Sequence, residues 1–72
     1  MSESGDRPIR VLIVEDEPVI AEANGEYLRR MGGFEVVATV ATAHDAMRTA
    51  SAAVSDGAPI DLVLLDLGLP DA

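Results

Sequence analysis

The sequence predicts an α/β fold with a parallel, doubly wound sheet, because short apolar runs alternate with segments of helical periodicity. Residues 10–14, 34–40 and 60–65 have the length and composition of strands. Between these runs, residues 18–31 and 43–54 repeat their apolar side chains with a period of about 3.6. Since strands that alternate with helices form parallel sheets with right-handed crossovers, these segments make about half of a doubly wound domain.

The strands are expected to differ in how they are covered. The run at 10–14 is continuously apolar after Arg10, which is typical of a strand covered on both faces. The run at 34–40 is mixed in pattern, so we expect it nearer a sheet edge. The run at 60–65 is apolar except for Asp61 near its start.

The first helix has a clear start and end. Asp16 or Glu17 can cap its N-terminus, and Gly32-Gly33 ends it before the second strand. The side chains expected on its buried stripe are Ile20, Ala23, Tyr27, Leu28 and Met31.

The second helix starts at a threonine. Thr42 followed three residues later by Asp45 resembles a capping box, and residues 56–59 break the helix. His44, the only histidine, is expected to be an exposed helix residue, with a phosphodonor role as the minor alternative. The side chains expected on its apolar stripe are Ala43, Ala46, Met47, Ala50, Ala53 and Val54.

Composition excludes several classes of function. The 72 residues include 13 acidic and 5 basic side chains, with no lysine and no cysteine, and the formal net charge is −8. Direct nucleic-acid binding and attachment to anionic membranes both need positive charge and are disfavoured. Without cysteine there is no disulfide or thiol chemistry, and no apolar run is long enough to cross a membrane. Because the N-terminus carries no secretory signal, we expect a cytoplasmic protein.

Acidic side chains follow two of the predicted strands. Glu15 and Asp16 come after the first strand, and Asp66 comes directly after the third. The carboxyl ends of parallel strands lie at one edge of the sheet, so these acids converge if the two strands are neighbours. Like charges in contact recruit a cation or raise a pKa, and oxygen ligands suit Mg²⁺. The alternative is that Glu15 and Asp16 only stabilise the first helix and that Asp66 is a turn former.

Two motifs give the sequence a specific resemblance. Residues 11–18 (Val-Leu-Ile-Val-Glu-Asp-Glu-Pro) and 61–71 (Asp-Leu-Val-Leu-Leu-Asp-Leu-Gly-Leu-Pro-Asp) resemble the receiver domain of two-component response regulators. The resemblance covers residues 9–72 and implies a flavodoxin-like fold, of which the chain holds the N-terminal half through the third strand. Residues 1–8 are polar and are expected to form a flexible lead-in.

The resemblance implies a site and a partner. Asp66 corresponds to the aspartate that accepts a phosphoryl group from a sensor histidine kinase. Mg²⁺ is then held by Glu15, Asp16 and Asp66 together with the main-chain carbonyl of Gly68. The chain has no match for the family's switch Thr or Ser, nor for its Lys. The resemblance implies a module that is not an enzyme and at most catalyses its own phosphorylation and dephosphorylation.

The same residues are compatible with further interpretations of the protein's function. Residues 27–34 and 66–71 look similar to regulators of the citrate/dicarboxylate-sensing type, which implies transcriptional control through a DNA-binding output domain absent from these residues. One alternative is a Mg²⁺-dependent phosphohydrolase with Asp66 as nucleophile. Gly68 counts against it, because haloacid dehalogenase-type enzymes carry a second aspartate at that position. Another alternative is an inert half-domain that self-associates through the unpaired edge of its third strand.

Overall fold

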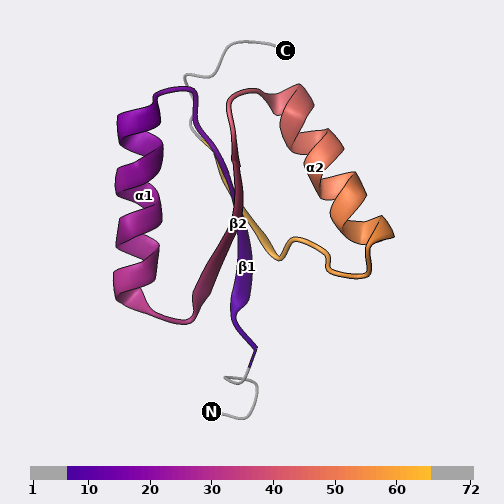
Figure 1. The fold of residues 1–72 in the computed structure, drawn as a ribbon, viewed down its shortest axis with the longest axis horizontal. Coiled ribbons are helices and arrows are strands. Elements are labelled where there is room, and N and C mark those ends of the chain that lie inside the picture. The colour runs from indigo at the N-terminus through magenta and orange to yellow at the C-terminus, as the bar shows by residue number, and fades with distance from the viewer. Residues whose placement is uncertain (1–6, 66–72) are drawn as a thin grey trace.

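The computed structural model describes residues 7–65 and confirms the α/β class (Figure 1). A three-stranded parallel sheet has the order β2-β1-β3, and α1 and α2 lie on opposite sides of it. This strand order is that of the first three strands of a flavodoxin-like fold, as predicted. No helix in the described range is long and apolar enough to span a bilayer. The elements are β1 (Ile9–Val14), α1 (Pro18–Met31), β2 (Phe34–Val40), α2 (Ala43–Ser55) and β3 (Leu62–Leu65).

The central strand β1 forms most of the core. Residues 11–14 have exposed fractions of 0–1%, so the prediction that this strand is covered on both faces is confirmed. On the α1 side, Val11 and Ile13 pack with Ala21 and Leu28. Burying an aliphatic side chain of this size stabilises a fold by about 1.5–3 kcal/mol, so β1 contributes more to the core than any other described strand.

The edge position expected for β2 is also confirmed within the described sheet. β2 pairs with β1 from Ile9 opposite Phe34 to Val14 opposite Val40. The register shifts once along the way, and Val37 is the residue that the shift skips. The pairing is regular again at the carboxyl ends of the two strands.

The predicted buried stripe of α1 is largely wrong. Ile20, Tyr27 and Met31 are about half exposed or more, with exposed fractions of 48%, 64% and 56%. The buried face consists instead of Ala21, Gly25 and Leu28, of which only Leu28 was expected. Residues spaced by four and three positions share one helical face, and this is the face that packs on β1.

The apolar stripe of α2 is confirmed only in part. Ala46, Ala50 and Ala53 are partly buried, whereas Met47 and Val54 are 73% and 65% exposed. Because α2 meets the sheet through alanines and has no fully buried residue, it contributes less apolar burial than α1. The helix start is as predicted, since the Thr42 hydroxyl accepts a hydrogen bond from the Asp45 N–H at 3.1 Å.

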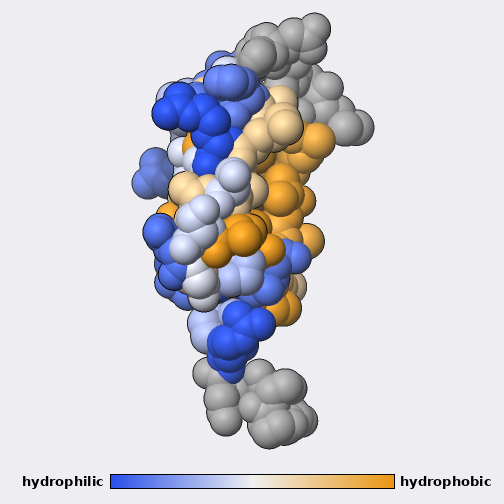
Figure 2. All heavy atoms as spheres, turned by 90° about the vertical axis from the view of Figure 1, so that its right-hand side faces the viewer, coloured by the Kyte–Doolittle hydropathy of each residue, from blue (hydrophilic) through white to orange (hydrophobic). Residues whose placement is uncertain are grey.

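Strand β3 begins at Leu62, two residues later than predicted. Asp61 uses its carboxylate to bond the main chain of β1, so regular strand pairing starts only after it. All four residues of β3 are 38–53% exposed. Hydrophobic side chains gather along one side of the molecule in Figure 2.

Candidate functional site

The two strands that precede the candidate acids are neighbours. β1 and β3 pair in parallel up to Val14 opposite Leu65, which confirms the condition on which convergence depends. Glu15 follows Val14, and in the sequence Asp66 follows Leu65. Asp66 and Gly68, the other predicted site residues, lie outside the described residues. The described part of the site is therefore the segment after β1.

Glu15 is held by both its main chain and its side chain. Its N–H donates to the Val40 carbonyl at 2.8 Å, which ties the end of β1 to the end of β2. Its Oε2 accepts the Glu17 N–H at 3.1 Å. With an exposed fraction of 6%, Glu15 is the buried charged residue of the described chain. Its side chain therefore helps to fix the turn that leads into α1.

Asp16 differs from Glu15 in its surroundings. It is exposed in the turn between β1 and α1, and none of the ion pairs within residues 7–65 includes it. Asp16 does not cap α1, because the N-cap residue is Glu17, which itself makes no side-chain capping bond. The expectation that Asp16 or Glu17 occupies the N-cap position is confirmed at Glu17, although its side chain makes no capping bond. Asp16 itself is exposed to solvent.

The described residues hold two of the predicted metal ligands. Within 7–65, no group of three or more His, Cys, Asp or Glu side chains lies close enough to hold a metal ion. Glu15 and Asp16 are adjacent at the carboxyl edge of the sheet, and both supply hard oxygen atoms. That donor chemistry fits Mg²⁺, which takes one or two protein carboxylates and completes its shell with water or phosphate oxygens.

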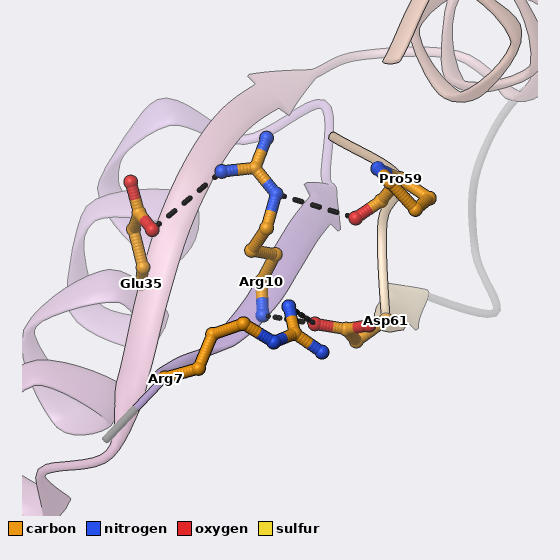
Figure 3. Close-up of polar contacts among 5 residues, drawn as sticks. All are labelled: Arg7, Arg10, Glu35, Pro59 and Asp61. Atoms are coloured by element: carbon orange, nitrogen blue, oxygen red, sulfur yellow. Dashed lines mark hydrogen bonds and ion pairs between the residues drawn. The ribbon is translucent and has the colours of Figure 1, made fainter. Parts of the chain in front are cut away.

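A polar cluster at the opposite edge of the sheet was missed by the sequence reasoning. Asp61 is bonded to Arg10 and paired with Arg7, and Arg10 also pairs with Glu35 (Figure 3). A signal was present, since strands one and three each carry one charged residue near the start of an otherwise apolar run. His44, by contrast, is exposed on α2 as expected.

Known protein families include one that matches most of this chain. The sequence profile of the response regulator receiver domain matches residues 11–72. This chain therefore belongs to the response regulator receiver domain family. No solved structure matches it at a significant level.

Curated relatives agree with this assignment. A probable C4-dicarboxylate response regulator, DctR of Halalkalibacterium halodurans, is 37% identical over 62 residues, which cover 86% of this chain and 25% of that protein. The transcriptional regulatory protein DcuR of Escherichia coli K12 is 36% identical, with coverages of 82% and 23%. A protein-glutamate methylesterase/protein-glutamine glutaminase of Anaeromyxobacter dehalogenans is 38% identical, with coverages of 94% and 18%. The chain thus spans a quarter or less of the length of these relatives.

Proposed function

We propose that this chain is a phosphoacceptor module, in which Asp66 accepts a phosphoryl group from a sensor histidine kinase in a Mg²⁺-dependent reaction. The pairing of Val14 with Leu65 supports the proposal most directly, because each of these residues is followed in sequence by a predicted site acid. At the edge where parallel strands end, the residues that follow them are neighbours. The exposure of Asp16 at this edge is a second support.

The carboxylates have distinct roles in this proposal. Glu15, Asp16 and Asp66 would hold Mg²⁺ together with the main-chain carbonyl of Gly68. When bound, the ion offsets the negative charge on the phosphoryl oxygens. One Asp66 oxygen attacks phosphorus in line, the bond from phosphorus to the histidine nitrogen breaks, and its electron pair stays on the imidazole. Glu15 keeps the turn before α1 in place through its bond to the Glu17 N–H.

The test is phosphorylation of the full chain by a small phosphoramidate in the presence of Mg²⁺. We expect one phosphoryl group that hydroxylamine removes, as for an acyl phosphate, and we expect Asp66→Asn to abolish it. Asp71→Asn is the matched control, because it changes another acid in the same segment and should leave acceptance intact. Label that survives in Asp66→Asn, or a phosphate that resists hydroxylamine, would contradict the assignment.

The response regulator as a whole is proposed to act in the cytoplasm on transcription. Relatives described as a dicarboxylate response regulator and as a transcriptional regulatory protein support a DNA-binding output domain. The methylesterase relative carries an enzymatic activity, so an enzymatic output is the second candidate. Binding of the complete regulator to promoter DNA, strengthened by phosphorylation, is the expected result that separates the two.

The phosphohydrolase reading remains the alternative from another class. Gly68 stands where that mechanism places its second aspartate, and glycine has no side chain to act as an acid or base. We therefore expect the chain to take up one phosphoryl group per molecule without multiple turnover of a phosphomonoester. Repeated release of phosphate from such an ester would favour the enzyme.

A further inference from the structure

The polar cluster at the amino edge of the sheet joins β1 to the segment entering β3. The Asp61 Oδ2 atom accepts the main-chain N–H of Arg10 at 2.9 Å (Figure 3). The Asp61 N–H in turn donates to the Arg10 carbonyl at 2.8 Å. The Arg10 Nε donates to the Pro59 carbonyl at 3.2 Å. One residue of β1 therefore holds the incoming chain through its N–H, its carbonyl and its guanidinium.

This arrangement determines the residue at which the pairing of β3 with β1 begins. In a regular parallel pair, the Arg10 N–H would bond a main-chain carbonyl of the neighbouring strand. Here the Asp61 carboxylate takes that N–H, and the paired stretch of β3 starts at Leu62, opposite Val11. Arg7 and Glu35 extend the cluster through ion pairs. The Arg7 Nη1 atom lies 3.5 Å from Asp61 Oδ2, and the Arg10 Nη1 atom lies 3.6 Å from Glu35 Oε1.

Hydrophobic patterning selects the register of β3 only weakly. The strand reads Leu-Val-Leu-Leu, and its four residues are exposed to similar extents of 38–53%. A slip along β1 would replace one apolar side chain by another on either face, so little burial energy opposes it. The carboxylate of Asp61 is the polar group whose hydrogen bond depends on the register. A slip of one residue moves its carboxylate by about 3.3 Å and breaks the bond to Arg10.

We propose that Arg10 and Asp61 form a register lock that fixes Leu65 opposite Val14 and thereby sets where the chain enters Asp66 relative to Glu15 and Asp16. Asp61 is thus a positioning residue at the edge of the sheet opposite the acids. The effect of the lock on Mg²⁺ binding rests on the proposed function. It follows because Mg²⁺ accepts oxygen ligands only near 2.0–2.1 Å. A displacement of about 3.3 Å at the end of β3 exceeds that tolerance.

The test uses three substitutions of Asp61 in the full chain. Asp61→Asn keeps an acceptor oxygen in the same place, Asp61→Glu keeps the charge but moves it, and Asp61→Leu removes the acceptor. The register is read from nuclear Overhauser effects between Val11 and Leu62 and between Ile13 and Leu64. Mg²⁺ affinity is read from the shift of the Asp16 amide signal.

The lock predicts that Asp61→Asn keeps the cross-strand signals and the Mg²⁺ affinity of the parent. Asp61→Leu should lose those signals and bind Mg²⁺ about 10–100-fold more weakly, as is typical when support behind a metal ligand is removed. Asp61→Glu should weaken the cross-strand signals and the Mg²⁺ affinity, although it keeps the charge. Leu28→Ala is the control for general destabilisation, because it opens the core on α1 and should leave the β1–β3 signals in place.

Two results would overturn the lock. One is native cross-strand signals in both Asp61→Leu and Asp61→Glu. The other is that Asp61→Asn loses the native register while Asp61→Glu keeps it, because charge rather than geometry would then hold the strand. This second comparison also tests the lock if Asp61→Leu does not fold. A failure of the proposed function looks different, because the parent chain would then not bind Mg²⁺ while the cross-strand signals still respond to the substitutions.

Discussion

At the scale of single residues, two adjacent acids have different physical roles. Glu15 is buried and its carboxylate accepts the Glu17 N–H, whereas Asp16 is exposed in the same turn. The Glu17 N–H belongs to an exposed residue, and a hydrogen bond of this kind stabilises a fold by about 0.5–1.5 kcal/mol. Glu15 therefore supports the turn in addition to its proposed role as a metal ligand. For Asp16, which does not cap α1, the proposed metal site is the one role expected.

A prediction at this scale concerns the pH dependence of stability. The hydrogen bond from the Arg10 N–H holds the pKa of the Asp61 carboxyl below its ordinary value of 3.8, and the charges of Arg7 and Arg10 act in the same direction against partial desolvation. Because the pKa is lower in the folded chain, this stabilisation is present above 3.8 and is lost as the pH falls through the folded value.

The measurement is urea unfolding of the parent and of Asp61→Asn over an acid pH series. The free energy of unfolding of the parent should fall more steeply than that of Asp61→Asn below about pH 4. The nearby charged groups Arg7, Arg10 and Glu35 are the same in both proteins, so the difference between the two curves isolates Asp61. Parallel curves would show that Asp61 has no perturbed titration.

At the scale of elements, α1 packs on the sheet through two small residues and one leucine. Ala21, Gly25 and Leu28 form its buried face, and a Cβ atom added to Gly25 would meet Arg29 Nη1 at 3.7 Å and Ile13 Cδ1 at 4.0 Å. Both distances are ordinary van der Waals contacts. The glycine is therefore not required by close packing.

We predict that Gly25→Ala stabilises the chain by about 0.5–1 kcal/mol, because alanine loses less backbone entropy than glycine when a helix forms. The measurement is the free energy of unfolding in urea. Ala21→Gly is the matched control on the same face and should destabilise by a similar or larger amount. A destabilised Gly25→Ala would mean that α1 packs more tightly on Ile13 than these distances indicate.

The elements also show what the sequence could and could not predict. The central strand was predictable because only a strand covered on both faces favours an unbroken apolar run such as residues 11–14. The buried face of α1 was not, because apolar residues lie around much of the helix and packing on the sheet selects among them. The convergence of the first and third strands followed from topology, whereas the role of Asp61 depends on main-chain geometry that residue type does not specify.

At the scale of the whole molecule, the hydrophobic surface is unevenly distributed. The residues of β3 are 38–53% exposed, and Figure 2 shows hydrophobic side chains gathered along one side. Within residues 7–65, β3 pairs with β1 on one side only. An apolar strand with an open edge is a template for pairing with another chain.

We predict that the isolated 72-residue chain self-associates in a concentration-dependent manner. Sedimentation equilibrium should show an apparent mass that rises with concentration, and Val63→Lys should lower it by placing a charge on β3. Val19→Lys is the control, because Val19 is 75% exposed on α1, away from the sheet edge. A parent chain that is monomeric throughout and melts in one sharp transition would contradict the prediction.

The central claim is that the acids following β1 and β3 form one cation site. A Mg²⁺ titration of the full chain, of Asp16→Asn and of Asp66→Asn tests it most directly, with Asp71→Asn as the control for the change in net charge. We predict saturable binding in the parent, about 10-fold or more weaker binding in each of the first two variants, and parental binding in the control. Binding that is unchanged by Asp16→Asn or Asp66→Asn would contradict the account.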